Sequence, residues 1–315
     1  MNAMEAAALL KERDNILILT HRRPDGDTVG CAAGLCIALR QAGKNAYVLP
    51  NEDATALIAP YIAGLESPEG WEPAFVVSVD IAGVGLFPES AKKWADKVGL
   101  AIDHHPSNEG FGAENCVDDT CAACGELMYD ICCELGEVTA EIALPLYVAV
   151  STDTGCFVYG NTTGRTHRVA ADLIQVGIPY REVNKRHFRT KSAKRLKLEA
   201  ILMQGLELLQ GDTLAIGAIS LDDMAAIGAT EEDAEDIAAF IGQVEGVYNS
   251  VTIRELKPGE CKLSVRTNPA KLNATRVCAL LGGGGHAAAA GCTVFGSVKE
   301  ARDAIVKAIE TVQAE

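Results

Sequence analysis

Short runs of apolar residues alternate with helix-like stretches through the first half of the chain. The apolar runs are residues 15–20, 45–49, 74–81 and 98–102. Near-continuous apolar runs are typical of parallel strands that are covered on both faces. Stretches with helical spacing are residues 1–15, 28–41, 121–135, 139–151 and 163–176. The pattern predicts an α/β fold whose N-terminal sheet is doubly wound and mostly parallel.

The second half of the chain has fewer and shorter elements. Strands are predicted at residues 213–220, 250–255, 261–267 and 291–295, and helices at residues 231–242, 273–281 and 297–313. This mixture is typical of a smaller α+β domain. The first pattern breaks after Gly177. We therefore predict one domain at residues 1–185, a basic helical linker at 186–198 and a second domain at 199–315.

Composition and charge narrow the classes of function. Hydrophobic residues make up 48% of the 315 residues, which excludes a disordered or coiled-coil chain. With 28 Lys and Arg against 43 Asp and Glu, the net charge is −15. Proteins that coat long duplex nucleic acid neutralise phosphates with basic residues, so that class is excluded. A small anionic substrate is not excluded, because a metal or a local basic patch can reverse the charge of a site.

One segment departs from the acidic balance. Residues 181–197 hold eight Lys or Arg and one Glu. Such a run is either a solvated helix face or a basic border of a cleft that receives anions.

The cysteines and the apolar runs indicate the compartment. The chain has 11 cysteines, yet it is long enough to bury a core without disulfides. The N-terminal residues lack the pattern of an export signal, and no apolar run approaches the length of a membrane span. We expect a soluble, cytoplasmic protein with reduced thiols and no membrane partner. Cys121 and Cys124 form a lone C-x-x-C, which we interpret as buried helix residues because zinc would need a second ligand pair.

Acidic and histidine side chains follow several of the predicted strands, and one follows an apolar helix. They are His21, Asp25, Asp27, Asp80, Asp103, His104, His105 and Asp153. Taken singly, each Asp could be a turn or cap residue, and Asp27 could cap the helix that starts at Thr28. The carboxyl ends of parallel strands, however, meet at one edge of a sheet, where ligands bind. We therefore expect these side chains in one site.

Several carboxylates at one site would repel one another unless a cation balances them. Carboxylate and imidazole together suit Mn, Zn or Fe better than Ca. Asp25 and Asp27 flank a glycine, so one turn could offer a carboxylate to each of two metals. Asp80, from a neighbouring strand, could bridge them.

These motifs resemble those of the DHH phosphoesterases. The order HRRPDGD at 21–27, VSVD at 77–80, IDHH at 102–105 and STDTG at 151–155 is similar to the family's first-domain motifs. The sequence GGGHAAAAG at 283–291 resembles the motif of the associated DHHA1 domain. The resemblance covers essentially the whole chain. In length and layout it is most similar to the nano-RNase and pAp-phosphatase branch.

The resemblance implies a dinuclear manganese centre, with Mg²⁺, Co²⁺ or another divalent ion as alternatives. One metal would be held by His21, Asp25 and Asp80, and the other by Asp27, Asp80, His104 and Asp153. The catalytic residues would be Asp103, which orients a ligand, and His105, which faces the substrate phosphate. In the second domain, the residues that grip a substrate phosphate would be Arg266, Gly283, Gly284, Gly285 and His286.

Two departures from the family pattern stand near the first motif. Cys31 occupies a position that is often Ser or Ala, and Thr28 replaces a common Ala. Alanines 287–290 replace polar residues that some relatives carry, so substrate contacts from that turn are in question.

The resemblance further implies hydrolysis of short oligoribonucleotides (nano-RNA), of 3′-phosphoadenosine 5′-phosphate (pAp), or of both. A terminal phosphate held by the second domain while the first domain cuts would select short substrates, with closure about residues 186–198. The alternatives are a pApA phosphodiesterase, an inorganic pyrophosphatase or exopolyphosphatase-like hydrolase, a RecJ-like exonuclease, and a non-catalytic nucleotide sensor. RecJ-like enzymes are normally longer. A homodimer is left open as the oligomeric state.

Overall fold

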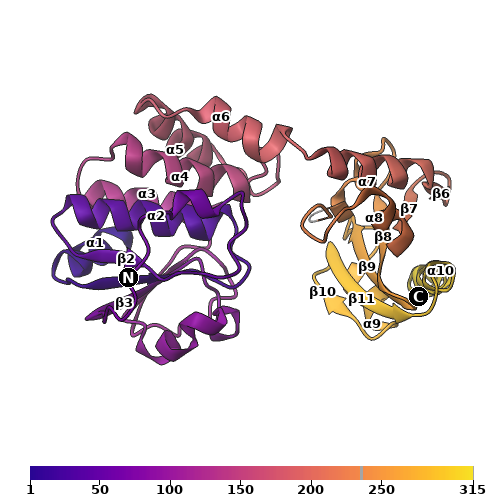
Figure 1. The fold of residues 1–315 in the computed structure, drawn as a ribbon, viewed down its shortest axis with the longest axis horizontal. Coiled ribbons are helices and arrows are strands. Elements are labelled where there is room, and N and C mark those ends of the chain that lie inside the picture. The colour runs from indigo at the N-terminus through magenta and orange to yellow at the C-terminus, as the bar shows by residue number, and fades with distance from the viewer. Residues whose placement is uncertain (235–236, 315) are drawn as a thin grey trace. The chain divides into compact units, whose positions relative to one another are not determined.

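The structure is a computed structural model that describes residues 1–234 and 237–314. The chain divides into two compact units, Met1–Thr190 and Lys191–Glu315 (Figure 1). Each unit has its own sheet and its own hydrophobic core.

The first unit is built on a five-stranded sheet in the order β2-β1-β3-β4-β5. Its strands, all parallel, are β1 (Ile16–Leu19), β2 (Ala46–Val48), β3 (Phe75–Val79), β4 (Leu100–Asp103) and β5 (Glu114–Val117). The predicted α/β class and parallel sheet are confirmed. The edge strand β5 was not predicted, because its sequence ENCV is polar and mostly exposed.

Helices cover one face of this sheet, and a 3-10 segment covers the other (Figure 1). The main helices are α1 (Ala3–Lys11), α2 (Gly26–Gln41), α3 (Cys124–Leu135), α4 (Ala140–Asp153) and α5 (Gly164–Gln175). The opposite face packs against η3 (Glu89–Lys97), while η1 (Ala59–Tyr61) and η2 (Val84–Leu86) are single turns. Alternate residues of β1 belong to different cores, Ile16 to one and Leu17 to the other. The continuous apolar run therefore reflects burial on both faces.

Two glycines let α2 and α4 approach each other closely. A β-carbon on Gly30 would lie 2.3 Å from the carbonyl oxygen of Pro145, and one on Gly34 would lie 2.7 Å from Leu146. Larger residues at these positions would push the helices apart. The close contact brings the first turn of α2 towards the last turn of α4, and both turns carry residues of the site.

The basic segment is divided between the two units. Helix α6 (Tyr180–Asn184) and the π-helical turn η4 (Lys185–Arg189) belong to the first unit. The His187 ring is 2.9 Å from the Tyr61 hydroxyl, and Arg186 donates to the carbonyls of residues 56 and 57. Helix α7 (Ala193–Gln204) begins the second unit, so the division falls inside the predicted linker 186–198.

The second unit has a six-stranded sheet in the order β10-β11-β9-β8-β7-β6, in which only β7 and β8 pair in parallel. The strands are β6 (Glu207–Leu209), β7 (Leu214–Ile219), β8 (Asn249–Lys257), β9 (Glu260–Thr267), β10 (Gly284–Gly285) and β11 (Ala289–Phe295). The remaining helices are α8 (Leu221–Ile227), α9 (Ala274–Ala279) and α10 (Val298–Ala314). The predicted α+β character is confirmed, although β6 and α8 were not foreseen.

The helix predicted at 231–242 is wrong for the part that the structure describes. Residues 235 and 236 lie outside the described residues, and the following part forms the short 3-10 turns η5 (Ile237–Ala239) and η6 (Ile241–Gln243). Their buried residues, Ile237 and Ile241, are four apart and mimic helical spacing.

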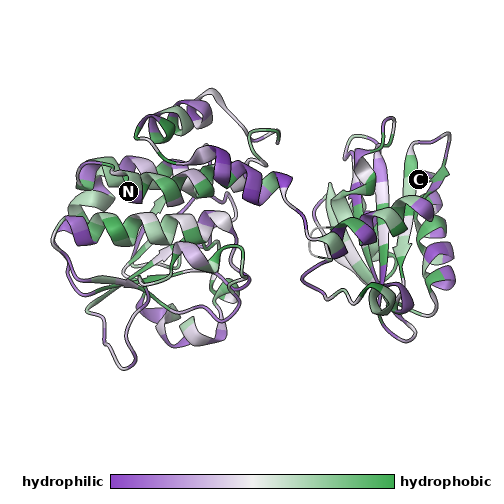
Figure 2. Cartoon of the chain, turned by 45° about the horizontal axis from the view of Figure 1, so that its top comes forward, coloured by the Kyte–Doolittle hydropathy of each residue, from purple (hydrophilic) through white to green (hydrophobic). Residues whose placement is uncertain are grey.

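Helices α2 and α10 differ in burial. Helix α2 is buried over most of its length, whereas α10 buries only Ala301, Ile305, Ala308 and Ile309 and alternates between hydrophobic and hydrophilic residues (Figure 2). Within residues 1–234 and 237–314, no helix combines the length and the apolar character that crossing a membrane requires.

Candidate metal centre

The predicted acidic and histidine residues stand at the ends of neighbouring elements. His21 follows β1, and Asp25 is the N-cap of α2, where its Oδ1 accepts hydrogen bonds from the amides of Asp27 and Thr28. The cap of this helix is therefore Asp25, and the alternative that Asp27 caps the helix beginning near Thr28 is wrong. Asp80 directly follows β3 and has a φ of 58°, in the left-handed region. Strain at such a residue is common at functional sites.

Among the described residues, seven of these side chains form three overlapping sets, and in each set the potential ligand atoms lie within 4.8 Å of one another. Two of the sets are the donor groups considered below, His21, Asp25 and Asp80, and Asp27, His104 and Asp153. The third set consists of Asp80, His104 and His105. Asp80 faces both groups. Its Oδ2 is 3.6 Å from His21 Nε2, and its Oδ1 is 3.5 Å from His104 Nε2. The two oxygens of one buried carboxylate thus point towards two different donor sets.

The two histidines present the same nitrogen to the centre. His21 Nδ1 lies 2.9 Å from the carbonyl of Arg22, and His104 Nδ1 lies 3.2 Å from the carbonyl of Cys121. A carbonyl oxygen can only accept, so each Nδ1 carries the hydrogen. Each Nε2 then faces the carboxylates, and in a neutral ring it offers a lone pair, which is the form that binds a metal.

Asp27 is fixed by groups that lie far away in the sequence. Its Oδ2 accepts from the Cys124 amide at 2.7 Å, and its Oδ1 accepts from the Gly125 amide at 2.9 Å. These amides begin α3, whose N-cap Ala123 offers no side-chain cap. The Cys31 thiol adds a third contact at 3.3 Å. Asp27 therefore caps α3, an interaction that sequence reasoning missed; the missing local cap at Ala123 was the only signal.

Asp103 anchors the next pair of residues. It is fully buried and accepts from the His104 amide and His105 Nδ1, each at 2.8 Å, and from Asn108 Nδ2 at 2.7 Å. Burial alone would raise the Asp103 pKa, but these donors outweigh it and lower the pKa. The Asp103 hydrogen bond in turn raises the His105 pKa to about 9, partly against burial. Asn108 was not predicted as part of the site.

The crowded, buried carboxylates of the centre favour a positive charge among them. Burial and neighbouring carboxylates raise the pKa of Asp27 well above its usual range, and burial raises that of Asp80. Burial also raises the pKa of Asp153 to about 6, although His104 opposes the shift. Burial lowers the pKa of His21, but Asp25 and Asp80 outweigh it and raise the pKa to about 10.

A metal ion would balance the negative charge of these carboxylates and would also give a bonding partner to a buried carboxylate oxygen that lacks one. Asp80 Oδ1 is buried and, within the described part of the chain, has no hydrogen-bond partner. The donors around it are carboxylate oxygens and imidazole nitrogens, which suit Mn²⁺, Zn²⁺ or Fe²⁺. The residues present therefore fit a divalent metal.

The predicted phosphate-binding residues of the second unit lie together on a hairpin. Gly284 and Gly285 form β10, which pairs with Gly291 and Ala290 of β11. Arg266 on β9 pairs with Ala289, whose carbonyl accepts from the His286 amide at 2.8 Å. The Arg266 and His286 side chains are exposed. Gly283 packs tightly, because a β-carbon there would lie 2.2 Å from the carbonyl of Gly291.

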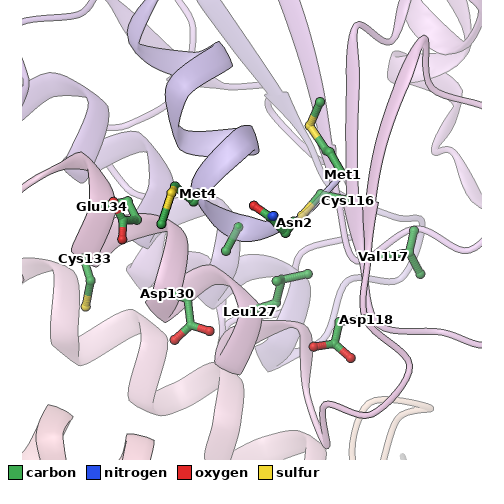
Figure 3. Close-up of a pocket in the computed structure, with 11 residues that line it drawn as sticks. Met1, Asn2, Met4, Cys116, Val117, Asp118, Leu127, Asp130, Cys133 and Glu134 are labelled. Carbon is green, nitrogen blue, oxygen red and sulfur yellow. The ribbon is translucent and has the colours of Figure 1, made fainter.

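A hollow of about 600 Å³ lies between α1, β5 and α3 (Figure 3), and it is not lined by residues of the acidic and histidine cluster. Its lining includes the carboxylates of Asp118, Asp130 and Glu134. Arg165 pairs with the first two, at 3.4 and 2.6 Å. Among the described residues, the groups that could hold a metal ion lie in the acidic and histidine cluster, so the cluster is the better candidate for phosphate chemistry.

Comparisons with known proteins show what the chain is similar to. Residues 15–150 match the DHH family, N-terminal domain. The chain is 33% identical to the bifunctional oligoribonuclease and PAP phosphatase NrnA of Thermus thermophilus, over 93% of this chain and 89% of that protein. It is 26% identical to the protein of the same name from Bacillus subtilis, over 95% of each chain.

Solved structures share the fold. An exopolyphosphatase-related protein from Bacteroides fragilis superposes with a TM-score of 0.87 at 22% identity, covering 99% of this chain and 96% of that one. The exonuclease RecJ bound to manganese superposes with a TM-score of 0.52 at 15% identity, covering 100% and 95%.

Proposed function

This chain belongs to the DHH family and hydrolyses phosphate esters, and we propose that its substrates are short oligoribonucleotides and pAp. Both relatives named above are called bifunctional oligoribonuclease and PAP phosphatase, and each is matched over most of its length. The match therefore extends over both units of this chain.

The observation that carries the proposal is the position of Asp80 between the two donor groups. We assign one divalent ion to His21, Asp25 and Asp80, and a second to Asp27, Asp80, His104 and Asp153. Manganese is our proposed metal, because the donor set is mixed carboxylate and imidazole. When bound, two such ions lower the pKa of a shared water and offset the charge of the phosphate.

The chain's own residues hold this arrangement in place. The carbonyls of Arg22 and Cys121 fix the tautomers of His21 and His104, so each Nε2 faces inward. The first amides of α3 hold Asp27. A site fixed in advance loses little entropy when the substrate binds, which favours turnover.

His105 is the proposed proton donor to the leaving oxygen. Its Nδ1 is engaged by Asp103, so Nε2 is the nitrogen available to substrate, and the side chain is 42% exposed. Asp103 itself is fully buried and accepts three hydrogen bonds, which suits an orienting residue rather than an acid. His105 also places positive charge near the phosphate.

In the second unit, we propose that Arg266 and His286 bind a terminal phosphate of the substrate. The exposed guanidinium can offer two parallel hydrogen bonds to phosphate oxygens. Of the glycines at 283–285, Gly284 leaves most room for an anion, because a β-carbon there would meet nothing within 4 Å, whereas the Gly283 amide already donates to the Cys278 carbonyl.

The decisive experiment combines a substrate panel with one substitution. We expect the full chain with Mn²⁺ to hydrolyse pAp and two- to five-residue RNA, pApA included, faster than pyrophosphate, whereas turnover of pApA alone would favour the pApA phosphodiesterase. Asp80→Ala should abolish turnover and sharply reduce bound manganese, measured by elemental analysis. The matched control is Asp96→Ala, an exposed Asp of η3, which should behave as wild type. Wild-type turnover by Asp80→Ala would refute the shared-carboxylate centre, and a preference for pyrophosphate would refute the substrate class.

A further inference from the structure

The segment that follows Asp153 is shaped unlike any other loop of the first unit. Three consecutive residues have left-handed backbone angles, Gly155 at φ 55°, Cys156 at 57° and Phe157 at 68°. Two of them are not glycine, and such residues rarely adopt these angles. Cys156 donates its amide to Ser151 at 2.7 Å. The chain therefore turns sharply back on the end of α4, next to the metal centre.

This turn sends neighbouring side chains in opposite directions. Phe157 is partly buried, and its ring stacks on His167 with centroids 5.3 Å apart. Val158 and Tyr159 point outward and are 80% and 60% exposed. Exposing two large apolar side chains beside a polar centre costs free energy, which a bound apolar surface would recover.

The exposed tyrosine is nevertheless held firmly. Its amide donates to the carbonyl of Thr154 at 3.0 Å, and its own carbonyl accepts from the Thr162 amide at 3.1 Å. The ring lies against Gly155, where a β-carbon would come within 2.5 Å of two ring carbons. One side of the ring is thus supported by bare backbone, while much of the side chain stays open to solvent.

The loop is also tied to the metal centre itself. Asn161 Nδ2 donates to the carbonyl of Asp153 at 3.1 Å and to that of Ala122 at 2.9 Å. The Asp153 carboxylate in turn lies 3.6 Å from His104 Nε2. The Tyr159 ring contacts the chain two residues from Asp153, a proposed metal ligand, so its position relative to that residue is fixed by covalent structure and hydrogen bonds.

We propose that Tyr159, with Val158 beside it, is a stacking shelf for the nucleobase of the nucleotide whose phosphate occupies the metal centre. The inference rests on the proposed function and names the part of the substrate that the acidic cluster cannot recognise. Aromatic rings bind bases by stacking, and the contact tolerates any base because every base has a π face.

The composition of the loop sharpens this to a base-tolerant shelf. Residues 154–162 carry no charged side chain. The Asn161 amide nitrogen already serves two backbone carbonyls. We therefore expect selection for the presence and the size of a base, with purines ahead of pyrimidines, rather than for one base identity.

The test compares two substrates on the full manganese-loaded chain. One is a diadenosine dinucleotide, and the other is the same phosphodiester with hydrogen in place of both bases. In Tyr159→Ala, the ratio of kcat/KM for the base-bearing to the abasic substrate should fall about 5- to 100-fold. Tyr159→Phe should restore the ratio. Met4→Ala, which removes another side chain that is 64% exposed, is the matched control and should leave the ratio at the wild-type value.

An unchanged ratio in Tyr159→Ala would overturn the shelf. If the wild-type chain hydrolyses neither substrate, the proposed function fails, and calorimetric titration then decides the shelf alone. The shelf requires that adenosine monophosphate binds more tightly than ribose 5-phosphate and that Tyr159→Ala removes this difference. Equal affinities, or no binding of either ligand by the wild type, would overturn it.

Discussion

The acidic cluster of the first unit and the glycine hairpin of the second unit are built in opposite ways. The cluster draws Asp27, Asp80 and Asp103 from separate elements and buries them, and it fixes Asp27 through amides that are distant in sequence. The hairpin of β10 and β11 carries His286 in its turn, beside Arg266 of the neighbouring strand β9, and both side chains are exposed. Changes in the cluster should therefore alter stability, metal binding and chemistry together, whereas changes in the hairpin should alter substrate binding alone.

The largest effect that separates the two regions is expected from Asp153→Asn. The folded-state pKa of Asp153 is raised to about 6 from 3.8, mainly by burial. The folded state then binds the proton more tightly than the unfolded state, so the wild-type chain loses stability as pH rises from about 4 to above 6. In EDTA at pH 8, the Asn variant should be about 1–2 kcal/mol more stable to urea than wild type, after allowing for solvent screening.

This gain should vanish at about pH 3, below the ordinary pKa of 3.8, where the carboxyl is protonated in both states. The same variant should lose most manganese-dependent turnover, so stability and activity would move in opposite directions. Asp96→Asn, on the exposed side of η3, should change neither quantity. An Asn variant that is less stable than wild type at pH 8 would show that the ionised Asp153 carboxylate does not destabilise the folded chain.

The next effect concerns the hairpin. Arg266→Ala should raise KM for pAp about 10- to 100-fold, because a bidentate charged hydrogen bond to phosphate is lost. The melting temperature should stay unchanged, since the side chain is exposed. Arg266→Lys should recover part of the affinity only, because an ammonium cannot form the paired bonds. Wild-type kinetics in the Ala variant would remove Arg266 from the binding site, and a lowered melting temperature would break the contrast between the regions.

The smallest effect tests the supports of the cluster. The Cys31 thiol donates to Asp27 Oδ1 at 3.3 Å. Cys31→Ala removes this donor and should weaken manganese binding about two- to fivefold, as expected for one weak hydrogen bond. Cys31→Ser keeps a donor at the same place and should bind manganese within about twofold of wild type. Equal affinities of the Ser and Ala variants would show that the thiol does not position Asp27.

The sequence was informative where structure depends on short-range pattern. The apolar runs of β1, β3 and β4 are continuous because both faces of each strand are covered, and the polar residues that follow them mark one edge of the sheet. Prediction failed where the hydrophobic pattern of a segment does not match the secondary structure that the segment forms. The polar edge strand β5 carries no apolar signal, and Ile237 and Ile241 have helical spacing in separate 3-10 turns.

The candidate site divides in the same way. The residues at strand ends, such as Asp80 and His104, could be predicted because the topology of a parallel sheet converges them. The groups that hold them could not, because the amides of Cys124 and Gly125 reach Asp27 across 97 and 98 positions of sequence. Asn108 and Tyr159 act through contacts that no spacing in the sequence encodes.

The close glycine contact between α2 and α4 determines the spacing of two residues in the second donor group. Asp27 stands in the first turn of α2 and Asp153 in the last turn of α4, so the separation of these carboxylates is set by how closely two helices pack. Gly30 has no β-carbon, so the carbonyl of Pro145 can approach α2 closely, and this contact sets the distance between the two helices. A side chain at Gly30 would push the two helices apart, and with them the two carboxylates that we propose as metal ligands.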